Sequence, residues 1–132
     1  MDTFKLEIYT PDRCFYDGPA QSLVLPIPDG EYGVMPGHEP TVTAIEPGEL
    51  RFQTAGGWQE AAVSSGFAEI MPDRTVLLVA SAEHPDEIDI RRAQQARERA
   101  EERLRQKQSV QEYYRSKAAL ARAMARLKTG RK

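Results

Sequence analysis

Proline and glycine are confined almost entirely to the first two thirds of this 132-residue chain. All nine prolines lie at or before Pro85, and eight of the nine glycines lie at or before Gly66. Both residues interrupt regular helices and mark turns, so the elements between them are short strands. Residues 86–132 contain no proline and a single glycine, Gly130, which leaves room for long helices. The sequence therefore divides into a strand-rich unit, residues 1–85, and a helical unit, residues 86–132.

Alternation of apolar and polar residues predicts the strands of the first unit. The clearest alternating series are Phe4-Leu6-Ile8 and Leu23-Leu25-Ile27. The run TVLLVA, residues 75–80, is continuous instead, which is typical of a strand covered on both faces. About eight to ten short strands in such a length predict a β-sandwich or flattened barrel.

Apolar residues of the second unit recur every three or four positions, which is the period of an α-helix. Two stripes follow this spacing: Ala93-Ala96-Ala100-Leu104 and Tyr113-Lys117-Leu120-Met124-Leu127. We expect the first helix to begin at Pro85-Asp86 and the second to be capped by Ser109, with Glu112 three residues on. Gly130 and the basic tail then end the second helix. The sequence thus predicts an N-terminal β-sandwich followed by a C-terminal antiparallel α-helical hairpin.

The hairpin is alanine-rich, and burial of one CH₂ contributes only about 0.8 kcal/mol. Two such helices are marginal alone, so we expect them to dock on the sandwich or on another chain, as a movable element. The charges support separate roles for the two units. Residues 1–85 carry four basic and thirteen acidic side chains, whereas residues 86–132 carry fourteen basic and seven acidic ones.

The sequence gives little sign of catalysis. His38 and His84 stand alone in turn-rich segments, and no His or Cys cluster with metal-ligand spacing is present. Ser64-Ser65-Gly66 lacks the frame of a nucleophile elbow, and no glycine-rich phosphate loop precedes a helix. We therefore predict a protein that is not an enzyme, with no catalytic residues and no metal. The stiff loop around His38 suits a protein contact surface.

Cysteine usage and hydropathy bear on the compartment. Cys14 is alone, which excludes an internal disulfide, favours a reducing compartment and predicts an ordinary buried cysteine in a strand. The longest apolar run is too short to cross a bilayer, and Asp2 argues against a secretory signal.

The arginines of the helical unit allow two interpretations. They fall on two helical stripes, Arg92-Arg99-Arg103 and Arg115-Arg122-Arg126. They are either solvated faces, with Glu98, Glu101 and Glu102 nearby, or guanidinium groups that converge on a polyphosphate when the helices fold together. Nucleic-acid binding is a weaker possibility, because few aromatic residues interleave and the acidic unit opposes it.

Three ordered segments carry a resemblance to a known family: PGHEPTVTAIEPGELRF, SSGFAEIMPDRTVLLVASAEH and IDIRRAQQARERAEERL. They resemble the epsilon subunit of the bacterial F-type ATP synthase over nearly the whole chain. The resemblance implies a non-catalytic subunit of the central rotor, peripheral on the cytoplasmic face of the cell membrane and without direct membrane insertion. Its implied partners are the gamma subunit, the c-ring and the alpha/beta catalytic head, and nucleic acid is not among them. The implied hairpin either extends into the head and blocks ATP hydrolysis or folds beside the sandwich.

The resemblance also implies particular residues. Glu31, Tyr32, Gly33 and His38 match the segment that this family sets against the c-ring and gamma subunit. Members that bind ATP share an Ile/Leu-Asp-x-x-Arg-Ala motif, and the implied ATP-binding residues are Glu83, Ile88, Asp89, Arg92, Ala93, Arg99, Arg122 and Arg126.

In this interpretation ATP is a regulatory ligand, and no cofactor is expected. Ile88 and Ala93 contact adenine, Glu83 and Asp89 hydrogen-bond its edge, and the arginines neutralise phosphates. Three hypotheses stay open at this point: a rotor subunit with an ATP-sensing hairpin, the same subunit with a ligand-independent hairpin ratchet, and a sandwich module with a basic nucleic-acid-binding tail.

Overall fold

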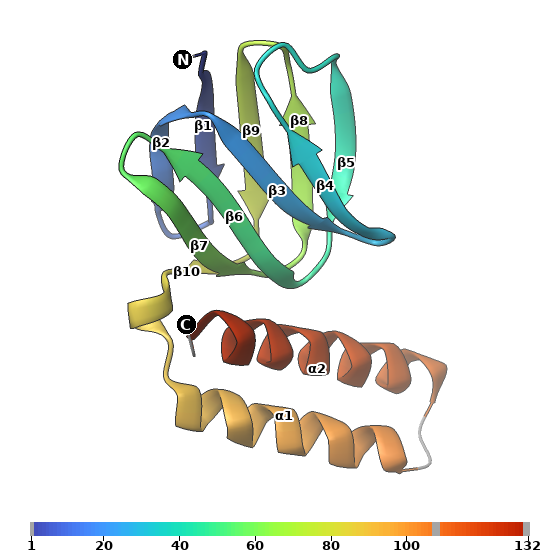
Figure 1. The fold of residues 1–132 in the computed structure, drawn as a ribbon. Coiled ribbons are helices and arrows are strands. Elements are labelled where there is room, and N and C mark those ends of the chain that lie inside the picture. The colour runs from blue at the N-terminus through green and yellow to red at the C-terminus, as the bar shows by residue number, and fades with distance from the viewer. Residues whose placement is uncertain (1, 107–108, 131–132) are drawn as a thin grey trace.

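The first unit folds into two packed five-stranded sheets in a computed structural model that describes residues 2–106 and 109–130 (Figure 1). The first sheet has the order β2 (Cys14–Ala20), β1 (Phe4–Tyr9), β9 (Arg74–Val79), β8 (Gly66–Ile70), β5 (Thr41–Ile45). The second has the order β10 (Ala82–Glu83), β7 (Gly57–Val63), β6 (Gly48–Thr54), β3 (Ser22–Ile27), β4 (Gly30–Val34). β1 and β9 pair in parallel, and every other pair of neighbouring strands is antiparallel. The predicted β-sandwich is confirmed.

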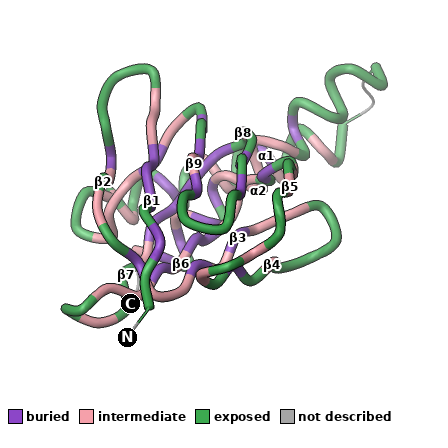
Figure 2. The backbone as a smooth tube through the Cα atoms, turned by 90° about the horizontal axis from the view of Figure 1, so that it is seen from above, coloured by how far each residue is buried: buried purple, intermediate pink, exposed green. Residues whose placement is uncertain are grey.

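The core lies between the sheets, where the buried parts of the strands concentrate (Figure 2). The alternating residues of β1 and β3 fill it, and Leu6, Ile8, Leu23 and Leu25 are completely buried. The prediction that residues 75–80 are covered on both faces is wrong. Leu78 is 58% exposed, because β9 turns only one face toward the core and no helix in the described parts of the chain covers the other.

Two helices follow the sandwich and form the predicted antiparallel hairpin. The first helix begins later than expected. Residues Pro85–Glu87 form a separate 3-10 turn, η1, and α1 spans Ile90–Arg105. Extended backbone at Ile88 and Asp89 separates the two, so Asp89 is the cap of α1, and its carboxylate accepts a 3.1 Å hydrogen bond from Arg92 N.

The second helix, α2 (Val110–Gly130), begins as predicted, with Ser109 Oγ accepting a 3.1 Å hydrogen bond from Glu112 N. Its described part ends at Gly130, and the basic tail at 131–132 lies outside the described residues. Gly130 permits a close approach of the helix ends. A Cβ at this position would lie 2.5 Å from Ile90 Cδ1 and 3.0 Å from Ile88 Cγ2.

α2 lies between α1 and the sandwich, packed on β6 and β7 (Figure 1). This position leaves one predicted stripe only partly confirmed: Leu127 is buried and Leu120 is half-buried. Tyr113, Lys117 and Met124 are exposed, whereas the buried residues of α2 are Ser116, Ala123, Ala125, Leu127 and Thr129. The predicted stripe described a helix with one buried face, but α2 has two packed sides. In α1, which has one, the predicted stripe is confirmed: its alanines Ala93 and Ala100 are buried, and Ala96 and Leu104 are half-buried.

The tight strand contact at Gly66 gives a test of the sandwich. A Cβ there would lie 2.0 Å from Leu78 O, a backbone atom of the paired strand β9 that cannot move without breaking the sheet. We expect Gly66→Ala to lower the free energy of unfolding by about 1–3 kcal/mol, the usual cost of overpacking. Urea denaturation followed by circular dichroism measures the change.

Gly33→Ala is the matched control, because Gly33 also lies in a strand and a Cβ there meets no atom within 4 Å. We expect its stability to be unchanged or slightly raised. Equal stability losses in the two variants would contradict the packing argument.

Candidate functional site

A cavity of about 380 Å³ lies where α1, the end of α2, β10 and η1 meet. Its volume is within the range of about 300–1,000 Å³ that is usual for small-molecule sites. The lining residues are Glu83, Glu87, Asp89, Arg92, Ala93, Ala96, Arg99 and Arg126. Six of the eight residues predicted for nucleotide binding are therefore brought together, from both helices and from the sandwich.

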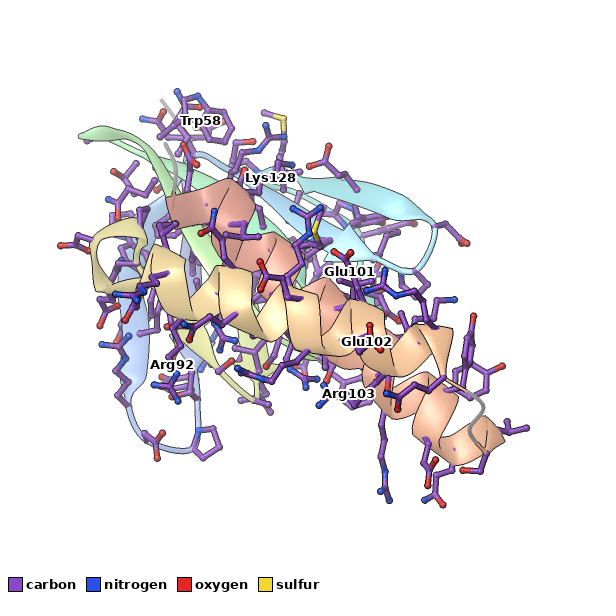
Figure 3. All side chains as sticks on the ribbon, turned by 90° about the horizontal axis from the view of Figure 1, so that it is seen from below. Trp58, Arg92, Glu101, Glu102, Arg103 and Lys128 are labelled. Carbon is purple, nitrogen blue, oxygen red and sulfur yellow. The ribbon has the colours of Figure 1, made fainter. Side chains whose placement is uncertain are left out.

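The geometry of α1 explains how its residues reach one cavity. Arg92 and Arg99 are seven residues apart, close to two helical turns, so both lie on the same side of the helix. Ala93 and Ala96 have small side chains and leave space beside the arginines. Figure 3 shows that Arg92 lies on one edge of α1 and Glu101 on the other. Neither Arg92 nor Arg99 forms an ion pair with another described residue, so both guanidinium groups can receive an anion.

Arg126 brings α2 into the site through an ion pair. Its Nε donates a 2.5 Å hydrogen bond to Glu83 Oε1, and both side chains are about two-thirds buried. This pair ties α2 to β10, the last strand of the sandwich. Arg126 is also one of the residues that line the cavity.

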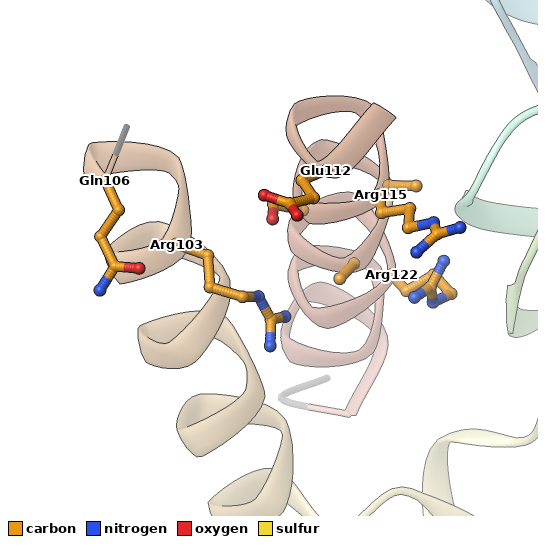
Figure 4. Close-up of a pocket in the computed structure, with 8 residues that line it drawn as sticks. Arg103, Gln106, Glu112, Arg115 and Arg122 are labelled. Carbon is orange, nitrogen blue, oxygen red and sulfur yellow. The ribbon is translucent and has the colours of Figure 1, made fainter. Parts of the chain in front are cut away.

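Two predicted residues lie outside this cavity. Ile88 packs against Gly130, with its Cγ2 and Cβ close to the position of a Cβ there. Arg122 lines a different cavity of about 590 Å³ between the far parts of the two helices, together with Arg103 and Arg115 (Figure 4). Arg122 also lines a small hollow against β7 together with Glu83 and Arg126, so it lies next to Arg126 without reaching the 380 Å³ cavity.

A contact that sequence reasoning missed reaches the cavity through one lining residue, Glu87. Arg13 donates to both carboxylate oxygens of Glu87, at 3.0 and 2.8 Å, and to Ala82 O at 3.0 Å. Next to it, the rings of Phe15 and His84 stack with centroids 4.1 Å apart. These pairs join residues about 70 positions apart in the sequence, and no local pattern points to them.

The Arg13 contact changes the acidity of Glu87. Its two hydrogen bonds, together with one from His84 N, stabilise the carboxylate and lower the pKa of Glu87 to about 2. The same pairing raises the pKa of Arg13.

The second predicted site, the protein contact surface, lies at β4. Glu31, Tyr32 and Gly33 belong to this strand, which is at the edge of its sheet. Tyr32 Oη and His38 Nε2 are 2.9 Å apart, and His38 Nδ1 lies 2.8 Å from Glu39 O. Because a carbonyl can only accept, Nδ1 is the donor, and in the neutral ring Tyr32 donates to Nε2. The loop that carries His38 is therefore anchored to the edge strand.

Cys14, predicted to be buried, is exposed at the first residue of β2, where its neighbour Phe15 faces the core.

Within the described ranges, no helix is long and apolar enough to span a membrane.

Comparisons with known proteins agree with this architecture. Residues 3–85 match the ATP synthase delta/epsilon chain β-sandwich domain, and residues 86–130 match the long α-helix domain of the same chains. The chain is 56% identical over 127 residues to an ATP synthase epsilon chain of Ruminiclostridium cellulolyticum, covering 96% of this chain and 95% of the relative. It is 47% identical over 131 residues to that of Caldanaerobacter subterraneus, covering 98% and 95%.

Solved structures show the same fold. A chain in the mitochondrial ATP synthase of Euglena gracilis (OSCP/F1/c-ring) aligns with a TM-score of 0.84 at 24% identity, covering 98% of this chain and 82% of that one. A chain in the central stalk and c-ring of the Tetrahymena thermophila mitochondrial enzyme aligns with a TM-score of 0.72 at 10% identity, covering 98% and 97%.

The fold and the family matches define a class: the sandwich-plus-hairpin subunits of rotary ATP synthases. Within this class, the chain belongs to the epsilon-chain family of the F-type ATP synthase, as the sequence motifs predicted. It is a non-catalytic subunit of that complex.

The Arg13–Glu87 pair predicts a pH dependence. Since the pKa of Glu87 is lowered from 4.5 to about 2, the stability that this pair contributes is fully present above pH 4.5. It is lost as the pH falls through about 2. We expect the Glu87 carboxyl resonance in an NMR titration to shift with a midpoint near 2.

Arg13→Ala should move this midpoint back toward 4.5, because the largest cause of the shift is removed. Lys5→Ala removes a cation that pairs with Asp17 on the same sheet, and it should leave the midpoint unchanged. A Glu87 midpoint near 4.5 in the unaltered protein would show that the pair does not form in solution.

Proposed function

We propose that this epsilon subunit is a central-rotor subunit that regulates ATP hydrolysis through a movable hairpin, and that ATP stabilises the folded hairpin. The observation that carries the ATP part is the 380 Å³ cavity, in which Arg92 and Arg99 of α1 and Arg126 of α2 share one space. Arginine suits phosphate because its planar fork donates paired hydrogen bonds to phosphate oxygens. The acidic Glu83 and Asp89 on the same wall supply acceptors for the amino group of adenine.

The placement of the arginines couples ligand binding to hairpin conformation. An anion in the cavity contacts both helices, and Arg126 also belongs to the contact between α2 and β10. The ligand therefore has higher affinity for the folded hairpin than for an extended one, and the difference in affinity shifts the equilibrium. ATP depletion then releases the hairpin, which extends toward the alpha/beta catalytic head and inhibits hydrolysis.

The proposed rotor contacts use the edge of the sandwich at β4. Glu31, Tyr32, Gly33 and His38, on β4 and its following loop, are proposed to face the c-ring and the gamma subunit. Support comes from the exposed edge of this sheet and from the anchoring of His38 by Tyr32, which give a shaped polar surface. The subunit is then peripheral, on the cytoplasmic face of the bacterial membrane.

Isothermal titration with ATP tests the cavity. We expect Arg92→Ala to weaken ATP binding roughly tenfold or more, since a charge-assisted hydrogen bond is worth about 1.5–3 kcal/mol. Arg91→Ala is the matched control: it removes the same charge from the neighbouring position, and Arg91 does not line the cavity. Equal losses in both variants would point to general electrostatic attraction instead of a site.

Hydrogen exchange separates an ATP-sensing hairpin from a ligand-independent ratchet. At an ATP concentration 100 times its Kd, we expect amides of α2 that exchange by hairpin opening to exchange up to about 100-fold more slowly. Amides of β1 and β9, buried in the sandwich, are the internal control and should change little. Binding of ATP without added protection in α2 would favour the ratchet.

A further inference from the structure

Glu87 is an acidic residue on the wall of a cavity proposed here to bind an anion. Its carboxylate is nevertheless fully engaged by groups that do not line the cavity. Arg13 donates to Oε2 at 3.0 Å and to Oε1 at 2.8 Å, and the backbone N of His84 donates to Oε1 at 2.8 Å.

Arg13 itself is held rigidly in this position. It closes the turn between β1 and β2, in which Thr10 N donates to Arg13 O at 2.9 Å and Arg13 N to Thr10 Oγ1 at 3.2 Å. Its guanidinium also donates to Ala82 O and lies 5.3 Å from the centre of the Phe15 ring. The cation is therefore fixed by the sandwich and not by the hairpin.

We propose that Arg13 is a positioning residue for the anion site: it holds the Glu87 carboxylate against the turn between β1 and β2, away from the arginines of the cavity. This inference rests on the proposed function. Without Arg13, Glu87 carries an uncompensated negative charge on the cavity wall. That charge attracts Arg92, Arg99 or Arg126 and repels a phosphate that would bind to them. Arg13 thereby keeps the cavity cationic without touching the ligand.

A double-mutant cycle with ATP as the probe tests this role in the full chain. We expect Arg13→Ala to weaken ATP binding roughly fivefold to tenfold at low salt, and the loss to shrink as salt screens the freed carboxylate. Glu87→Gln should bind ATP at least as tightly as the unaltered protein. The double variant Arg13→Ala/Glu87→Gln should recover most of the lost affinity, because no carboxylate is left to compensate.

Lys5→Ala is the control for loss of one positive charge from the sandwich, since Lys5 pairs with Asp17 away from the hairpin. Its affinity for ATP should not change. If Arg13→Ala does not fold by circular dichroism, Arg13→Gln removes the charge and the paired hydrogen bonds to Glu87 while retaining a polar side chain at this position.

The outcomes separate the two proposals. If the unaltered protein binds no ATP, the proposed function fails and this inference fails with it. If it binds ATP and Arg13→Ala binds equally well, this inference alone is overturned. A loss in Arg13→Ala that Glu87→Gln does not rescue, or an equal loss in Glu87→Gln by itself, also overturns it, because both results would show that the carboxylate is not what weakens binding.

Discussion

The contact between α2 and the end of the sandwich determines where every part of the hairpin lies. Its buried centre is a polar one: Thr129 is fully buried and its Oγ1 donates a 3.0 Å hydrogen bond to Glu49, which is 7% exposed. One helical turn earlier, Arg126 pairs with Glu83. The apolar share of this surface comes largely from small side chains, so directional polar bonds fix the position of α2 while apolar burial adds a modest free energy. Such a contact gives one defined docked geometry without making it permanent.

The cavity is a consequence of this order of layers. α1 packs on α2, and the connector that leads from β10 to α1 along the chain is residues 84–89. The 380 Å³ cavity lies where the connector, α1 and α2 meet. Its walls therefore come from one element continuous with the sandwich, one packed on the sandwich and one packed on α2. A ligand that contacts all three elements would bind differently when α2 is docked on the sandwich and when it is not. A site elsewhere on the sandwich could bind as tightly and would not report on the hairpin at all.

Much of this was predictable from local pattern, and the errors have a common physical cause. The spacing of apolar residues and the positions of proline and glycine predicted the sandwich, the hairpin and the cap at Ser109. These features depend on neighbours within a few residues. The buried face of α2, the exposure of Leu78 and the absence of Arg122 from the 380 Å³ cavity depend on how the elements pack on one another, and a single sequence carries no such information.

The cap at Asp89 shows that sequence-based prediction can also fail for local structure. Pro85-Asp86 and Asp89 both have the composition of a helix start, and the structure uses the first for a separate turn. Six residues that line the cavity were among those implied by the family resemblance, and three of them, Asp89, Arg92 and Ala93, belong to its Ile/Leu-Asp-x-x-Arg-Ala motif. The Arg13–Glu87 contact was not, since it joins residues 74 positions apart.

The charges at the junction show how two kinds of electrostatic interaction are combined. Overall the sandwich is acidic and the hairpin is basic, and this general attraction acts over a distance and is weakened by salt. Arg126–Glu83 follows that sign pattern, whereas Arg13–Glu87 reverses it, with the base on the sandwich and the acid just after residue 85. A reversed pair gains nothing from the overall electrostatic field, so its stability must come from its geometry, and the bidentate Arg13 fork supplies it.

The Arg13 contact also decides where the Glu87 carboxylate lies. Glu87, at the start of the helical unit, is held on the sandwich side, and the arginines of α1 remain on the side that faces α1. The three acidic and three basic side chains of the cavity wall sum to zero formal charge, but the pairing of Glu87 with Arg13 leaves Arg92 and Arg99 without an acidic partner among the described residues.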